Sequence, residues 1–227
     1  RLLVREWADA IDEVLRHAWV NLGLDQFSDL ALLAVGGYGR AELHPASDVD
    51  VLILHDGTEL PTGAEGAVSQ FITHLWDLGL DIGSSVRSLS DCVRLATEDI
   101  TIATNIMESR TLVGDERLRR DMQRLTGPDR LWPGKAFFIA KRDEQIARHA
   151  KHNNTEYNLE PDLKNAPGGL RDIQTIGWVA KRHFGADTLR DLVAHGFITE
   201  AEFIELDECQ CVLWRVRFAL FIVSGRS

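Results

Sequence analysis

The stretch VGGYGRAELHPASDVDVLIL, residues 35–54, decides the fold that we expect for this chain. Before it, the apolar run 30–35 ends at two consecutive glycines, Gly36 and Gly37, as a buried strand does at a turn. Within it, residues 48–54 alternate between polar and apolar side chains, which is typical of a strand with two different faces. We therefore expect a strand, a glycine turn that leads into a short helical turn, and a second strand.

Asp48 and Asp50 share one face of this second strand, because residues two apart point the same way. Two like charges so close together are unfavourable unless a cation lies between them. Mg²⁺ prefers oxygen ligands and is often held by one or two carboxylates together with substrate phosphates. Two such ions about 4 Å apart can assist phosphoryl transfer. The pair therefore indicates a metal-dependent site, although an Asp-x-Asp sequence alone is most often a solvated strand end.

Gly36 and Gly37 strengthen this interpretation. Backbone N–H groups point outward where a strand ends and a helix begins, and glycine lets a phosphate approach them without a Cβ in the way. Arg40, one short turn later, could contact a phosphate or hold the strand of the aspartates in place. Ser47 could bond the same phosphates. A Gly-Gly pair is common by itself, but the order of strand, Gly-Gly, helix and Asp-x-Asp strand favours a functional site.

Two helices and a third strand are expected around this motif. Residues 2–22 and 65–78 show helical periodicity, and Gly79 ends the second of these helices. Residues 80–87 alternate again, as a strand does. Their polar face carries Asp81, Gly83, Ser85 and Arg87.

The remainder of the chain is expected to be helical, in two parts. A helix capped by Ser90 begins the first part, and more helix follows to about Arg124. Breaks that contain proline and glycine follow at 127–134, and helical periodicity resumes beyond them. We therefore predict an α+β domain over residues 1–125 and an all-α domain over residues 134–227.

The composition is that of an ordinary globular protein and argues against two classes of partner. Hydrophobic residues make up 44% of the 227 residues, which is enough for a core. Asp and Glu outnumber Lys and Arg by 35 to 25, whereas proteins that bind nucleic acid usually carry a basic surface. No apolar run approaches the roughly 18 residues of a membrane span. The three cysteines form no spaced pairs, which argues against a disulfide framework and favours a cytoplasmic protein. We therefore expect no nucleic-acid and no membrane partner. The oligomeric state is left open.

Residues 35–54 resemble the signature of the polymerase-β-type nucleotidyltransferase superfamily. Residues 75–87 and the segments 157–164 and 168–173 resemble the family of bacterial bifunctional PII uridylyltransferase/uridylyl-removing enzymes, in the same order along the chain. The resemblance implies a small mixed-sheet domain with helices packed on it, followed by an all-α domain. Such enzymes also carry an HD-type hydrolase domain and two ACT domains, neither of which we expect within residues 1–227. We therefore expect a C-terminally truncated fragment with transfer chemistry, but without uridylyl removal or glutamine control.

The resemblance also implies a reaction. Enzymes of this family transfer UMP from UTP to a tyrosine hydroxyl of PII, a small nitrogen-signalling protein, and release pyrophosphate. Mg²⁺, with two ions during turnover, would be held by Asp48 and Asp50. The superfamily usually adds a third carboxylate, for which Asp81 is our candidate and Asp77, at a helix end, is the rival.

The residues that the resemblance implies for nucleotide binding are spread over both predicted domains. In the first they are Gly36, Gly37, Arg40, Ser47, Ser85 and Arg87. In the second, Lys164 and Arg171 would face the triphosphate if the loop around residues 168–169 returns toward the catalytic cleft. The alternative for this loop is ordinary turn and cap chemistry. A basic helical patch, which we interpret as a solvated face, is formed by Arg148, His149, Lys151 and His152.

Three other functions stay open. An adenylyltransferase that modifies glutamine synthetase belongs to the same superfamily, and residues 168–172 also resemble that family, so the residues alone do not fix the base. A second alternative is a nucleotide-binding regulatory module without activity, against which the intact Asp48 and Asp50 argue. A nucleic-acid polymerase is the third, and both the acidic balance and the lack of an aromatic and basic stripe count against it.

Overall fold

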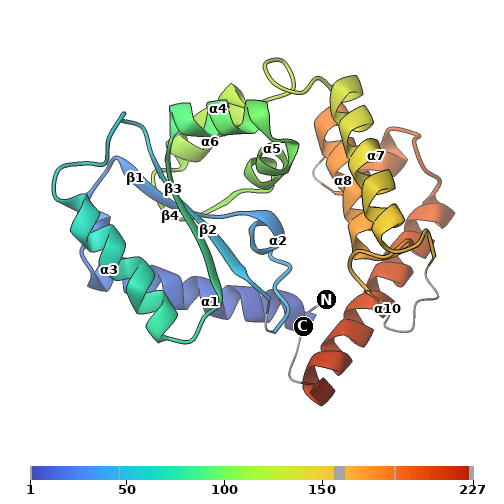
Figure 1. Ribbon diagram of the computed structural model, residues 1–227, viewed down its shortest axis with the longest axis horizontal. Coiled ribbons are helices and arrows are strands. Elements are labelled where there is room, and N and C mark those ends of the chain that lie inside the picture. Colours follow the sequence, from blue (N-terminus) through green and yellow to red (C-terminus); the bar gives the residue numbers. More distant parts are fainter. Residues whose placement is uncertain (1, 46, 156–161, 187, 225–227) are drawn as a thin grey trace. The chain divides into compact units, whose positions relative to one another are not determined.

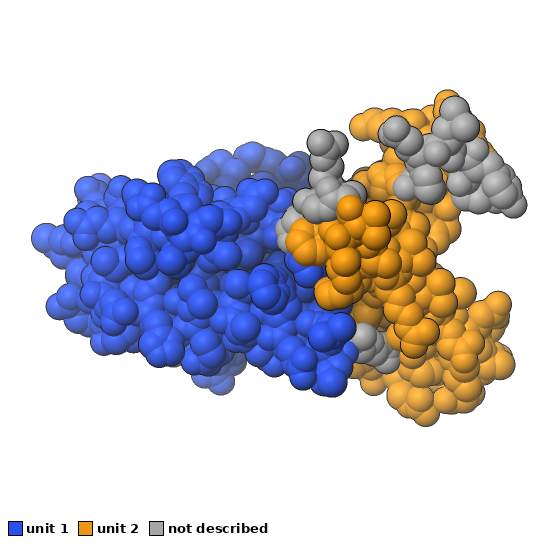
Figure 2. Space-filling view, turned by 90° about the horizontal axis from the view of Figure 1, so that it is seen from below, with its two compact units in different colours: residues 1–126, 225–227 blue, residues 127–224 orange. Residues whose placement is uncertain are grey.

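The computed structural model describes residues 2–45, 47–155, 162–186 and 188–224. They fall into two compact units, residues 1–126 and residues 127–224, which Figure 2 draws in blue and orange. Each unit has a hydrophobic cluster of its own. Among the described residues, no helix combines the length and the apolar character needed to cross a membrane.

A four-stranded sheet forms the centre of the first unit. Its strands are β1 (Leu30–Ala34), β2 (Val49–His55), β3 (Ile82–Ser88) and β4 (Arg110–Gly114), in the spatial order β3-β2-β1-β4. β1 pairs antiparallel with β2 and with β4, whereas β2 and β3 run parallel. The unit is therefore α+β with a small mixed sheet, as the sequence predicts. The parallel pair requires a crossover, and the helix between β2 and β3 supplies it.

Helices cover both faces of this sheet (Figure 1). α1 (Leu2–Asn21), the short 3₁₀ helix η1 (Leu24–Gln26) and α3 (Ala64–Asp77) pack on one face. α4 (Leu89–Glu98), α5 (Ile100–Met107) and α6 (Glu116–Leu125) lie on the other. Both faces of β1 are thus buried, which agrees with its unbroken apolar sequence.

The main core lies between the sheet and the pair of helices α1 and α3. Val49, Val51 and Ile53 of β2 belong to it, which confirms the apolar face expected for this strand. Trp19 of α1 and Phe71 of α3 meet edge to face there, with their ring centroids 5.4 Å apart. Because side chains alternate along a strand, the side chain of residue 50 projects from the opposite face, which carries α4, α5 and α6.

Two predictions for the segment after β3 are wrong. Residues 110–114, expected to be helical, form β4, because the free edge of β1 offers backbone hydrogen bonds that outweigh weak local preferences. The cap of α4 is Ser88 and not Ser90: the Ser88 hydroxyl accepts a hydrogen bond from the Asp91 N–H at 3.0 Å. The Asp91 carboxylate accepts in return from the Ser88 N–H, which completes a capping box.

The elements described in the second unit are helices: α7 (Gly134–Lys151), α8 (Leu170–Phe184), α9 (Asp191–Ala194) and α10 (Glu200–Ser224). α7 and α8 pack against each other. Ala180, Ala186 and Leu192 form a small apolar cluster beside α8 and α9. Residues 157–161 of the segment that resembles the uridylyltransferase family lie outside the described residues, as does Ala46 within the first motif.

Candidate active site

Asp50 lies in the parallel pair of β2 and β3, opposite Gly83. The Val49 N–H donates to the Asp81 carbonyl oxygen at 2.7 Å, which fixes this register where both strands begin. A Cβ built on residue 83 would overlap with Oδ1 of Asp50. The carboxylate therefore occupies a space that residue 83 leaves open only because it is glycine.

Gly36 borders Asp50 from the other side. The Val35 N–H donates to the Asp50 carbonyl oxygen at 3.0 Å, so the entrance to the glycine turn stays attached to β2. Gly36 has a φ of +58°, in the left-handed region, and a Cβ there would lie 3.3 Å from Oδ2 of Asp50. Residue 36 is therefore suited to glycine both by its backbone and by the space around it. A short helical turn is present as the sequence predicts, but α2 (Gly36–Gly39) begins at the glycines and ends before residues 40–43, which were expected to belong to it.

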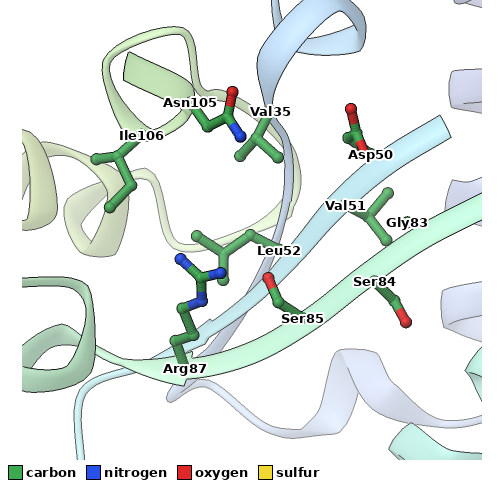
Figure 3. A pocket seen from close by; sticks show the side chains of 10 residues that line it. All are labelled: Val35, Asp50, Val51, Leu52, Gly83, Ser84, Ser85, Arg87, Asn105 and Ile106. Atoms are coloured by element: carbon green, nitrogen blue, oxygen red, sulfur yellow. The ribbon is translucent and has the colours of Figure 1, made fainter. Parts of the chain in front are cut away.

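An open pocket of about 190 Å³ lies beside Asp50, between the two parallel strands and α5. Its polar lining residues are Asp50, Ser84, Ser85, Arg87 and Asn105. Figure 3 shows Arg87 extending from the end of β3 into the space that Asn105 faces from α5. Ser85 and Arg87, two of the expected nucleotide-contacting residues, thus share a pocket with Asp50. A carboxylate and a guanidinium in one small polar hollow suit a ligand that has both a metal-bound phosphate and hydrogen-bonding groups.

Asn105 is a pocket residue that the sequence does not single out. Its Oδ1 lies 3.5 Å from the position that a Cβ on Gly36 would take. No local motif marks this asparagine, because its approach to Gly36 depends on the packing of α5 against α2. Only the tertiary structure could identify it.

Asp48 and Asp81 lie at the entrance to the site. Both side chains are exposed, and each residue directly precedes its strand, one position before the paired residues Val49 and Ile82. An extension of the strand pleat by one residue would predict the face of Asp50 for both. Among the described residues, however, no three acidic, histidine or cysteine side chains are gathered closely enough to hold a metal ion. Metal ligation by these three aspartates therefore stays a prediction.

Arg40 is engaged in ion pairs instead of pointing into the pocket. Its Nε donates to Glu42 at 2.9 Å and its Nη1 donates to Glu108 at 3.0 Å. Burial disfavours the charged guanidinium, but the two carboxylates outweigh it and raise the pKa of Arg40. Of the two roles expected for Arg40, the structure favours the structural one, with the turn held to the end of α5 and not to the aspartate strand. Ser47 is half-buried in a turn closed by its N–H and the His44 carbonyl, and it does not line the pocket.

Lys164 and Arg171 belong to the second unit, and their contact with a triphosphate stays a prediction. The Lys164 N–H donates to the Asp162 carboxylate at 2.9 Å, and the Arg171 N–H donates to the Lys164 carbonyl at 2.9 Å. The Arg171 guanidinium lies over the Trp178 ring, 5.2 Å from its centroid. These contacts form the turn that leads into α8.

Asp172 organises this turn, and it corrects the interpretation of the basic patch on α7. Its carboxylate accepts from Arg148 at 2.6 Å, from Gln145 at 2.7 Å and from the Gly168 N–H at 2.8 Å, and it lies 3.1 Å from His149 Nε2. Arg148 and His149 are therefore part-buried groups that fasten a loop, and not a solvated face. The sequence could not show this, because the shared carboxylate lies more than twenty positions further along the chain.

Comparison with known proteins finds one matching family model and several similar enzymes. Residues 136–227 match the model of GlnD PII-uridylyltransferase. The whole chain is 51% identical to a "Bifunctional uridylyltransferase/uridylyl-removing enzyme" of Azotobacter vinelandii, 52% to one of Stutzerimonas stutzeri and 50% to one of Pseudomonas aeruginosa. In each case the match covers 100% of this chain but 25% of the relative, so the chain spans about a quarter of their length.

Likeness to solved structures is weaker. A crystal structure of a toxin-antitoxin with AMP-PNP aligns with 61% of this chain and 95% of that chain, at 17% sequence identity and a TM-score of 0.29. A likeness at this level does not bear on the fold or on the site.

Proposed function

We propose that this chain transfers UMP from UTP to a tyrosine hydroxyl of the PII signalling protein, starting from the match of residues 136–227 to the GlnD PII-uridylyltransferase model. The support from the sequence is the identity of about half of all residues to enzymes named for uridylyl transfer. The support from the geometry is one observation: the Asp50 carboxylate lies between two glycines at a polar pocket.

The donor atoms around Asp50 suit Mg²⁺. Asp50 offers a hard carboxylate oxygen beside the pocket, and Asp48 and Asp81 directly precede the two parallel strands that border it. Gly83 and Gly36 leave free the space beside Asp50 that a Cβ would fill. We propose that these three aspartates hold the metal, with Asp81 as the third carboxylate. When bound, Mg²⁺ would neutralise charge on the triphosphate and on the departing pyrophosphate.

The remaining residues of the site would bind and orient the nucleotide. Gly36 and Gly37 let the triphosphate approach the backbone closely, because neither carries a side chain. Arg87 would contribute a positive charge and Ser85 a hydroxyl from the same face of β3. In the reaction, the tyrosine oxygen forms a bond to the α-phosphorus, the bond to pyrophosphate breaks, and the hydroxyl proton is released. The role of this chain is mainly to hold these groups in line, as in other phosphoryl transfers.

Incubation of the protein with PII and each of labelled UTP, ATP and CTP tests this function. We expect label on a PII tyrosine from UTP with Mg²⁺, and no label after EDTA. Asp50→Asn should abolish labelling and leave the circular dichroism spectrum unchanged. Asp56→Asn, in the exposed loop after β2, is the matched control and should remain active.

The outcomes separate the alternatives. Labelling from ATP alone would point to an adenylyltransferase and contradict the uridylyl assignment. UTP binding without transfer to PII would point to a regulatory module without activity. Full activity of Asp50→Asn would contradict the proposed mechanism.

A further inference from the structure

A buried polar cluster holds the glycine turn from within the core. Tyr38, the third residue of α2, is 1% exposed, and its hydroxyl donates to Oδ1 of Asp12 at 2.6 Å. Asp12 lies in α1 and is 2% exposed. Arg110 of β4 donates to both carboxylate oxygens of Asp12, and its Nη2 also donates to the Tyr38 carbonyl at 3.4 Å. Helix α1, strand β4 and the turn are thereby joined at one carboxylate.

Burial of the charged groups of this cluster costs hydration free energy, which apolar core residues do not lose. The Asp12 carboxylate is taken out of water and the Arg110 guanidinium is partly buried, so both lose hydration. Apolar residues of similar volume often stabilise a fold equally well. Burial first, and then the hydrogen bond to Asp12, raise the pKa of Tyr38, so its hydroxyl stays protonated and remains a donor. The cluster fixes the direction of the Tyr38 side chain, which apolar packing does less strictly.

The turn is also fixed on its other side. A Cβ on Gly39 would overlap with the Glu108 carbonyl oxygen at the end of α5, so the backbone of the turn and that of α5 are in close contact. Arg40 donates to the carboxylate of the same Glu108. A turn bounded on one side by α5 and anchored on the other by Tyr38 has little freedom to move away from Asp50.

We propose that Asp12, Tyr38 and Arg110 are positioning residues for the nucleotide, which keep the turn of residues 35–40 in the place where Gly36 borders Asp50. The proposal rests on the proposed function, because the nucleotide is the ligand assigned to this site. None of the three side chains lines the pocket, so they act through the turn and not on the reacting atoms. Without the anchor, only a fraction of molecules would have the turn in place, and apparent nucleotide affinity falls by that fraction.

Steady-state kinetics of Tyr38→Phe in the intact protein tests this role, because the variant removes one hydroxyl and keeps the ring. We expect the KM for UTP to rise by about tenfold, as for loss of one hydrogen bond to a charged acceptor. At saturating UTP the nucleotide itself selects the correct turn, so kcat should stay within about twofold. Asp12→Asn, which keeps an oxygen acceptor for Tyr38, should retain more of the affinity than Asp12→Ala.

Asp115→Ala is the matched control for stability. Asp115 caps α6, where its carboxylate accepts from the Arg117 N–H at 2.7 Å. Among the described residues, its side-chain hydrogen bond and ion pairing are with Arg117 and not with the turn. Its loss should lower the midpoint of thermal unfolding by an amount comparable to Tyr38→Phe. The KM for UTP should not change in this control.

The results distinguish this inference from the proposed function. A Tyr38→Phe variant that loses stability like Asp115→Ala but keeps the wild-type KM would overturn the positioning role, as would a loss confined to kcat. Equilibrium titration with UTP measures affinity without turnover. Wild-type protein that binds UTP but modifies no acceptor would refute the proposed reaction. The ratio of the UTP dissociation constants of Tyr38→Phe and wild type would still decide the positioning role.

Discussion

Asp50 and Gly83 lie opposite each other in the parallel pair of β2 and β3, and the Asp50 carboxylate fills the space where a side chain on residue 83 would be. Gly83→Ala should therefore displace this carboxylate without removing it. We expect kcat/KM to fall by about a hundredfold, the cost of a displacement of roughly 1 Å in an active site. Overpacking should lower the free energy of unfolding by about 1 to 3 kcal/mol. Transfer assays and urea unfolding measure the two effects.

Gly66→Ala is the control for this substitution. Gly66 lies in α3, and a Cβ there would meet nothing within 4 Å. Alanine in a helix should raise the free energy of unfolding by about 0.5 to 1 kcal/mol and leave activity unchanged. Equal activity of the Gly83→Ala and Gly66→Ala variants would contradict the importance of the space beside Asp50.

Asp81→Asn tests the third carboxylate. Removal of a group that only hydrogen-bonds to a metal ligand lowers activity by roughly 10- to 100-fold. If Asp81 itself helps to hold the metal, Asp81→Asn should lower activity by at least this factor. The Mg²⁺ concentration for half-maximal activity should also rise. Asp77→Asn, at the exposed end of α3, should behave like wild type. The reverse pattern would transfer the role to Asp77. Titration of activity with Mg²⁺ in both variants makes the comparison.

Arg40 and Glu108 should act as a pair. Glu108 is 6% exposed, so removal of Arg40 leaves a poorly solvated charge and should cost about 3 kcal/mol of unfolding free energy. Removal of Glu108 should cost less, because Arg40 keeps its ion pair with Glu42. In a double-mutant cycle of Arg40→Ala and Glu108→Gln, the two losses should not add, and the nucleotide KM should be the same in both single variants. A larger KM for Arg40→Ala than for Glu108→Gln would show that Arg40 contacts a phosphate.

Asp172 should make the stability of the second unit depend on acid pH. Burial opposes its ionisation, but hydrogen bonds from Arg148, Gln145 and Gly168 outweigh this and lower its pKa below 3.8. A pKa lowered by folding contributes stability that is present above the ordinary value, near 4, and is lost as the pH falls through the folded value. Asp172→Asn should therefore be less stable at pH 7 by about 2 kcal/mol, with the deficit shrinking below about pH 4.

Urea unfolding at several pH values measures this dependence. Asp143→Asn, an exposed position on α7, is the control and should unfold like wild type at every pH. A deficit of Asp172→Asn that stays constant from pH 7 to pH 3 would show that the carboxylate charge contributes nothing.

The sequence predicts the parts of this site that follow from local patterns. Alternation places Asp50 on the face opposite Val49 and Val51, and the glycines end β1, as the structure confirms. β4 and Asn105 were beyond local patterns, because each depends on a partner far away in the chain. β4 exists because β1 has an open edge. Asn105 matters because α5 packs against the turn, which no spacing of residues along the chain records.

The buried contact between Asp12 and Arg110 joins residues 98 positions apart. Contacts of such separation form late in folding, because the intervening chain must first lose its freedom. During synthesis, a nascent chain that has emerged only as far as β3 already contains the glycines and carboxylates of the site. Its Tyr38 hydroxyl has Asp12 available but lacks Arg110, and β1 lacks its second neighbour. Competence to hold a nucleotide should therefore arrive with the edge strand β4, after Gly36, Asp50 and Arg87 have been made.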